Sequence, residues 1–180
     1  MVILYSNKEN PLDTFWKELG DNEKVKNTRA HFALIGDGMM KNKLIQQKIK
    51  RKINNVEFID SMPKKEIFKY ILSSDCGISI LQKKKVFETI YSNKTFDYMC
   101  CKKPVIMCID GVSRKLVEDS KAGFFIDPDN HIDFSKKINE LISNEKKCQV
   151  LGENGYKYVK ENFDRNYLSD KYIKKIKDMV

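Results

Sequence analysis

Short apolar runs rich in Ile, Val, Leu and Phe alternate along the chain with longer segments in which apolar residues recur at helical spacing. The short runs predict strands buried on both faces of a sheet, and the longer segments predict amphipathic helices. Such alternation is typical of one three-layer, Rossmann-like α/β domain, with a parallel sheet of about six strands and helices on both faces. The strands are predicted at 2–5, 31–35, 56–59, 76–81, 104–109 and 123–126, and the helices at 12–19, 39–52, from Pro63, from Ser92, and at 132–143, 146–162 and 165–179.

The charge of the chain indicates what kind of partner it suits. A length of 180 residues is enough for one domain with a sizeable core. The 34 Lys and Arg residues against 25 Asp and Glu residues give a net charge of +9, which suits sugar nucleotides, lipid phosphates or nucleic acid. A compositional bias toward Lys, Asn and Ile, with most lysines on solvated helix faces, is the alternative explanation for individual lysines.

The cysteines and histidines indicate neither a disulfide framework nor a metal site. The five cysteines include the adjacent Cys100 and Cys101, which cannot easily bridge to each other, while Cys76 and Cys108 fall in predicted strands as small core residues. The two histidines are far apart and no Cys-x-x-Cys occurs. Since no signal peptide or membrane-spanning apolar stretch is evident, we expect a cytoplasmic protein without metal or cofactor.

The segment between the strands at 76–81 and 104–109 is the most informative part of the chain. Ser92 can cap a helix whose apolar stripe is Phe96, Met99 and Cys100. A helix that begins just past the carboxyl end of a strand points free N–H groups and a positive dipole end into the ligand crevice of an α/β sheet. The start of this helix is therefore the predicted ligand site.

Two charged residues of this helix suggest the ligand. Lys94 lies in the first turn, where a cation meets the positive end of the dipole and is unfavourable unless an anion lies between them. Asp97 follows one turn later on the same face and could accept hydrogen bonds from hydroxyls. A basic residue for phosphate and an acidic residue for ribose form a small site for a nucleoside diphosphate. A surface ion pair between Lys94 and Asp97 at i,i+3 spacing is the alternative.

Several short motifs occur in an order that resembles a known family. The order is similar to the C-terminal, sugar-nucleotide-binding domain of retaining glycosyltransferases with the two-Rossmann-domain (GT-B) fold. It is most similar to bacterial enzymes of the group-one type (family four), which build surface polysaccharides on lipid carriers. The resemblance runs from about residue 30 to the end, over Gly36-Asp37-Gly38, the segments 55–58 and 62–66, the aspartate-led strand 75–78, the segments 92–99, 103–106, 122–126 and 152–159, and Phe163-Asp164.

The resemblance implies how the donor is bound. In the family, the loop after the third strand holds the base through main-chain groups, which points to Met62. The helix that begins at Asn93, just after Ser92, receives the diphosphate, with Lys94 as its basic residue. The acidic residue one turn on, usually Glu, binds the ribose hydroxyls; here it is Asp97, whose side chain is shorter.

Two further positions relate less directly to the family pattern. Gly36 and Gly38 belong to the expected substrate-binding set, but a purely structural turn explains these glycines equally well. Many members also carry a glutamate near the transferred sugar, two helical turns before the ribose-binding acid. Thr89 has that spacing here and Glu88 is one residue out, so no catalytic residue is assigned.

The resemblance also implies what the domain works with. We expect a nucleotide-sugar donor, first of all a UDP-sugar, and retaining transfer to a polysaccharide or lipid-linked acceptor. The family's glycine-rich loop after the first strand is replaced by residues 6–10, and the family's N-terminal Rossmann domain is missing from the sequence. We therefore expect this domain to be inactive alone and the full enzyme to lie at the surface of the inner membrane.

A non-catalytic α/β module, either receiver-like or binding nucleotide or nucleic acid, is the alternative function. A receiver would need clustered acidic residues at strand ends, and a nucleic-acid binder would need basic residues interleaved with exposed aromatics on one face. Neither pattern is evident, because the lysines are spread over most predicted helices and Lys83-Lys84-Lys85 is expected to be a solvated loop. We therefore expect no nucleic-acid partner.

Overall fold

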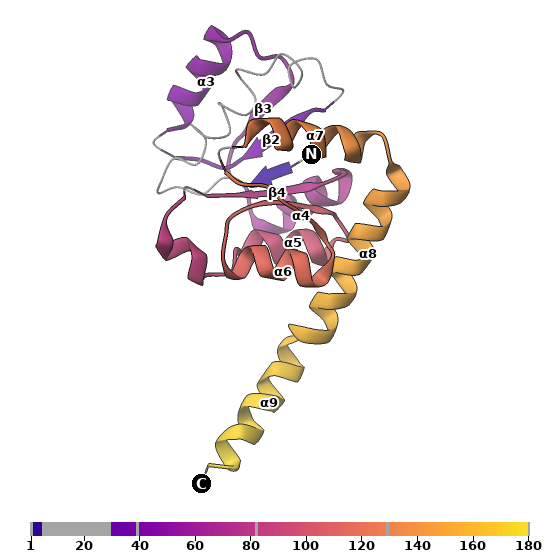
Figure 1. Cartoon of the computed structure of the whole chain (residues 1–180). Helices are drawn as coiled ribbons and strands as arrows, with labels where there is room; N and C mark the ends of the chain where they lie inside the picture. The colour runs from indigo at the N-terminus through magenta and orange to yellow at the C-terminus, as the bar shows by residue number, and fades with distance from the viewer. Residues whose placement is uncertain (1, 5–29, 39, 82, 129, 180) are drawn as a thin grey trace.

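Six parallel strands form one sheet in the computed structural model, which describes residues 2–4, 30–38, 40–81, 83–128 and 130–179 (Figure 1). The strand order is β3-β2-β1-β4-β5-β6, and all neighbouring strands are parallel. The predicted parallel sheet is therefore confirmed, and each strand lies within its predicted run. The strands are β1 Val2–Leu4, β2 Phe32–Ile35, β3 Val56–Ile59, β4 Gly77–Ile80, β5 Val105–Cys108 and β6 Gly123–Phe125.

Helices cover both faces of this sheet, as predicted. On one face, Phe32 of β2 packs in a core cluster with Leu44 of α3 and Phe134 of α7. On the other face, Ile35 of β2 packs in a second cluster with Tyr98 of α5 and residues of α4 and α6 (Figure 1). The helices are α3 Lys41–Lys50, α4 Lys64–Ser73, α5 Asn93–Cys100, α6 Val112–Ser120, α7 His131–Ile142, α8 Glu145–Asn162 and α9 Arg165–Lys177, with a short 3₁₀ helix, η1, at Lys85–Thr89.

The helix between β5 and β6 was not predicted. Helix α6 has nine residues, and its apolar residues are Val112, Leu116 and Val117, too few repeats for a clear helical period. Its formation depends on burying Leu116 and Val117 in the second core cluster. The helix predicted at 12–19 and the loop at 6–10 lie outside the described residues.

Two details of the predicted helices are wrong. The predicted apolar stripe of α5 included Cys100, but Cys100 is exposed and the buried side chains of α5 are Thr95, Tyr98 and Met99. The residue that opens α4 is Lys64, with Pro63 one position earlier as the N-cap. By contrast, Cys76 and Cys108 are buried core residues as predicted, and burial raises the pKa of the Cys76 thiol to about 12.

Helix α5 packs directly against β4. The Tyr98 hydroxyl donates to the Ile78 carbonyl at 3.3 Å, and the hydroxyls of Ser79 and Thr95, both buried, are hydrogen-bonded at 2.9 Å. A Cβ added at Gly77 would lie 2.2 Å from the Tyr98 ring, so only glycine lets the ring approach the strand. The start of α5 is thereby held rigidly beside the end of β4.

Replacing Gly77 with alanine should destabilise the domain. Because the added methyl would overlap a buried ring, we expect Gly77→Ala to lower the free energy of unfolding by about 1–3 kcal/mol. Gly155→Ala in α8 is the control, since its Cβ would come no nearer than 3.0 Å to a neighbouring atom, against 2.2 Å at Gly77, and alanine favours the helix. Urea unfolding of both variants tests this, and equal losses would contradict the proposed close approach.

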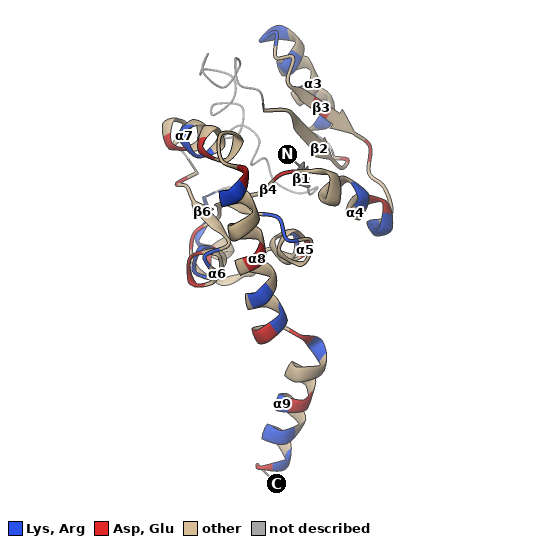
Figure 2. Cartoon of the chain, turned by 90° about the vertical axis from the view of Figure 1, so that its right-hand side faces the viewer, with Lys and Arg blue, Asp and Glu red and all other residues tan. Residues whose placement is uncertain are grey.

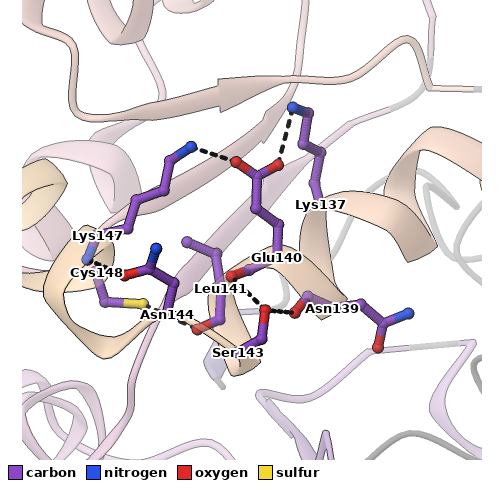
Figure 3. Close-up of polar contacts among 8 residues, drawn as sticks. All are labelled: Lys137, Asn139, Glu140, Leu141, Ser143, Asn144, Lys147 and Cys148. Carbon is purple, nitrogen blue, oxygen red and sulfur yellow. Dashed lines mark hydrogen bonds and ion pairs between the residues drawn. The ribbon is translucent and has the colours of Figure 1, made fainter.

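A polar network fixes the connection between α7 and α8 (Figure 3). The Glu140 carboxylate accepts hydrogen bonds from Lys147 and Lys137, which hold the pKa of that carboxyl below its usual range. The Asn144 side chain caps α8 by accepting from the Lys147 N–H at 2.9 Å, and the Ser143 hydroxyl donates to carbonyls in the last turn of α7. This connection directs α8 along the domain, where it packs against α5, α6 and α7.

Helix α9 extends away from the rest of the domain (Figures 1 and 2). None of its residues is buried. Its lysines alternate with exposed apolar side chains, which include Leu168, Tyr172 and Ile176. The charges of α9 are mixed along its length rather than gathered into one block, as Figure 2 shows.

Candidate functional site

The sheet reverses its strand order between β1 and β4, which are neighbours at its centre. In open parallel sheets, ligands bind at the carboxyl ends of the strands beside this switch point. The predicted site residues lie on the connections that follow β2, β3 and β4, so the topology gathers all of them at one edge of the sheet. The predicted parallel sheet already implies one shared edge, whereas the strand order that puts the switch point between β1 and β4 is known only from the structure.

The connections after β2 and β3 are joined by one lysine. Lys41 of α3 donates to the Gly36 carbonyl at 3.2 Å and pairs with Asp60, whose pKa it lowers through a hydrogen bond. Gly36 has φ of 151°, which residues with side chains rarely adopt, and the Gly38 N–H donates to the Asp37 carboxylate at 2.8 Å. The turn therefore has a structural reason for Gly36, and its predicted contact with substrate stays a prediction.

A second ion pair joins the connection after β3 to α5. Lys64, at the start of α4, lies 2.9 Å from the Asp97 carboxylate, which is 20% exposed. Met62 lies two residues before Lys64 and packs against the core cluster that contains Tyr98. The structure thus brings the predicted base-binding connection beside the predicted ribose-binding residue, through a lysine to which the sequence assigned no role.

The start of α5 provides the features that anion binding requires. Ser92 occupies the N-cap position as predicted, but its side chain makes no capping hydrogen bond. The first N–H groups of a helix have no partner within it, so the turn that begins at Asn93 can offer them to a ligand. Lys94 is half-buried in this turn, and its desolvation lowers its pKa to about 8. A cation there meets both desolvation and the helix dipole, and a bound anion would offset both.

The short 3₁₀ helix η1 contains Glu88 and Thr89, the two residues whose role the family pattern left open. The Thr89 hydroxyl donates to the Val86 carbonyl at 3.1 Å, a bond within its own turn. Glu88 is exposed and lines a small hollow with Lys83 and Asp110, at the carboxyl ends of β4 and β5. Lys83 pairs with Asp127 at 3.2 Å and is exposed, as predicted for this loop. Thr89 is thus engaged within η1, whereas Glu88 lines this hollow.

A cavity of about 560 Å³ lies at the opposite edge of the sheet. It is lined by residues that precede β2, β4 and β5, among them His31, Asp75 and Lys103, and by the α7–α8 connection. Volume alone would favour this cavity. We assign the site to the carboxyl edge instead, because the partly desolvated Lys94, the start of α5 and the switch point coincide there.

Within the described part of the chain, no group of three or more His, Cys, Asp and Glu side chains could hold a metal ion. Across the same residues, no helix has the length and apolar character needed to cross a bilayer.

Known proteins place this fold and sequence in one family. Residues 7–158 match the family described as glycosyl transferases group 1. An uncharacterized glycosyltransferase of Methanocaldococcus jannaschii is 27% identical over 139 residues, which are 77% of this chain and 38% of that protein. The chain therefore spans well under half the length of this relative.

Several solved structures share the fold of this chain. Sucrose-phosphate synthase of Thermosynechococcus elongatus superimposes with a TM-score of 0.77 at 13% identity, over 99% of this chain and 45% of that one. HepE of Anabaena in complex with UDP-glucose gives 0.76 at 19% identity, over 98% and 48%. The C-terminal domain of the group 1 family protein LpcC from Francisella tularensis gives 0.73 at 18% identity, over 91% and 86%. Since the family match covers most of its length, the chain belongs to the group 1 glycosyl transferases.

Proposed function

We propose that this domain binds the nucleoside diphosphate of a UDP-sugar and holds it for retaining transfer of the sugar. The observation that carries the proposal is the start of α5, where the half-buried Lys94 and the carboxylate of Asp97 lie one turn apart at the switch point of the sheet. A uridine nucleotide is the first ligand to test, because HepE of Anabaena, which shares the fold, was solved with UDP and with UDP-glucose.

In this proposal each edge residue contacts a different part of the donor. The diphosphate lies at the first turn of α5, against the N–H groups that follow Ser92 and beside Lys94. Asp97 accepts hydrogen bonds from the ribose, and its ion pair with Lys64 places it next to the connection that carries Met62, whose main chain holds the base. Gly36 and Gly38 lie at the same edge and border the donor from the side of β2.

The proposed chemistry is departure of the nucleoside diphosphate. The bond between the anomeric carbon of the sugar and a phosphate oxygen breaks, and the electron pair leaves with the diphosphate. Lys94 and the positive end of α5 stabilise the negative charge that develops, the part that a metal ion would otherwise play. Glu88, which lines the hollow beyond β4, is proposed to face the transferred sugar.

We propose that transfer requires a second Rossmann domain. The chain matches sucrose-phosphate synthase and HepE over 45% and 48% of their lengths, so those proteins contain much that has no counterpart here. Holding the sugar and the acceptor in register can account for about 7–11 kcal/mol of the activation barrier to transfer. A domain that binds the donor alone cannot align the acceptor with it. The acceptor is proposed to be a polysaccharide or lipid-linked glycan, which would bring the full enzyme to a membrane surface.

UDP binding should need no divalent metal. Because Lys94 and α5 supply the positive charge, calorimetry should give the same Kd for UDP with EDTA and with Mg²⁺. GDP, ADP and a single-stranded oligonucleotide are the comparison ligands. Strict dependence on Mg²⁺ would contradict the role of α5, and preference for the oligonucleotide would favour a nucleic-acid-binding module instead.

A further inference from the structure

The chain that leads into α5 is held by a side chain of α6. The Ser113 hydroxyl donates to the Ile90 carbonyl at 2.9 Å and accepts from the Ser92 N–H at 3.1 Å. Ser113 itself is fully buried. One hydroxyl thus satisfies two backbone groups on either side of Tyr91, across the boundary between two successive strand–helix units.

Gly111, the N-cap residue of α6, lies against the segment that leads into α5 at its other end, beside Glu88. Gly111 has φ of 78°, and a Cβ there would lie 2.0 Å from the Glu88 carbonyl oxygen. Only glycine permits this approach. The 88–92 segment is therefore fixed by Gly111 at Glu88 and by Ser113 at Ile90 and Ser92.

The contacts of Ser113 act on the residue that caps α5. Ser92 is the N-cap, and its carbonyl accepts the first hydrogen bond of the helix, from the Thr95 N–H at 2.9 Å. Its own N–H is held by Ser113 rather than by α5. Ser113 therefore constrains the Tyr91–Ser92 peptide, which immediately precedes the first turn of α5.

We propose that Ser113 is a positioning residue of the donor site, which orients the start of α5 for the diphosphate without touching the ligand. This inference rests on the proposed function of α5. The alternative is that Ser113 only satisfies buried backbone groups, as Ser120 does at the other end of α6, where the hydroxyl donates to the Val117 carbonyl of its own helix at 3.2 Å. Both serines are buried in α6, and only Ser113 reaches the donor site.

The pair Ser113→Ala and Ser120→Ala tests this directly. Each variant removes one buried hydroxyl from α6, and Ser113→Ala should lose more thermal stability because it leaves two backbone groups without that partner. UDP affinity should fall about three- to tenfold in Ser113→Ala and stay unchanged in Ser120→Ala. Only Ser113→Ala loosens the 88–92 segment, which UDP binding would then have to order. Uridine affinity should stay unchanged in both, and exchange of the Ser92 amide proton should accelerate only in Ser113→Ala. If Ser113→Ala fails to fold, Ser113→Thr retains the hydroxyl and Ser113→Cys replaces it with a larger thiol that forms weaker hydrogen bonds; UDP affinity should fall more in Ser113→Cys than in Ser113→Thr.

The possible outcomes distinguish the role of Ser113 from the proposed binding of UDP by this domain. UDP binding by the wild-type domain with equal affinity in Ser113→Ala would overturn the role of Ser113 and leave the donor site intact. A similar loss of UDP affinity in Ser120→Ala would show that any buried hydroxyl of α6 matters only for stability. Failure of the wild-type domain to bind UDP would overturn both proposals.

Discussion

Replacing Lys94 with alanine should weaken UDP binding about 10- to 100-fold and leave uridine binding unchanged. Hydrogen bonds to charged groups contribute about 1.5–3 kcal/mol, and those of Lys94 would be made in a partly desolvated crevice where screening by salt is weak. Because uridine has no phosphate, it should not sense the change. The ligand-free domain should keep its stability or gain about 0.3–1 kcal/mol, since a cation in the first turn opposes the helix dipole.

Calorimetry with UDP and uridine and thermal unfolding without ligand measure these effects. Lys94→Met retains the packing of the aliphatic stem and separates loss of charge from loss of volume. Lys83→Ala is the matched control, because Lys83 is exposed and pairs with Asp127 beyond the same strand. A large drop in melting temperature with unchanged UDP affinity would make Lys94 a structural residue. A loss of UDP affinity in Lys83→Ala alone would move the anion site to the loop after β4.

The pH dependence of the wild type gives an independent reading of Lys94. Burial lowers its pKa to about 8 in the ligand-free domain, and a bound phosphate should raise it again. Below pH 8 the lysine is protonated with and without ligand, so affinity is full. Above pH 8 binding must first recover the proton, and UDP affinity should fall about tenfold by pH 9. The stability of the ligand-free domain should rise over the same range, because the unfolded chain binds more protons. Both trends should be absent in Lys94→Ala.

Replacing Asp97 with asparagine should weaken binding of UDP about tenfold and change binding of 2′-deoxy-UDP much less. A carboxylate that accepts from a ribose hydroxyl forms a charge-assisted hydrogen bond, whereas the amide accepts without the charge. Titration of both nucleotides against both proteins gives the ratio of affinities. Equal losses for the two ligands would show that Asp97 does not contact the sugar hydroxyl.

The ion pair of Asp97 with Lys64 requires its own control. Lys64→Gln removes the pair but retains the carboxylate of Asp97, which lies 2.9 Å from the lysine in the structure. We expect Lys64→Gln to keep the preference for ribose over deoxyribose. If Lys64→Gln instead reproduced the effect of Asp97→Asn, the contribution of Asp97 would be to hold the connection after β3 rather than to bind ribose.

Local patterns were sufficient for much of the fold. The short Ile- and Val-rich runs predicted all six strands, because a strand covered on both faces must be apolar throughout. The helix start at Ser92 and the positions of Lys94 and Asp97 in successive turns also follow from spacing along one helix. Helix α6 escaped prediction because its few apolar residues become a buried face only when the sheet is present.

What only the tertiary structure decided is how the parts of the site meet. The strand order, the contact of Lys64 with Asp97 and the burial of Lys94 each depend on segments from different strand–helix units. Ser113 accepts a hydrogen bond from the N–H of Ser92, which lies 21 residues earlier, and no periodic pattern relates the two positions. Periodicity reports which face of an element is buried. Which element covers it, and which polar groups then come within hydrogen-bonding distance, is determined by the packing of the whole domain.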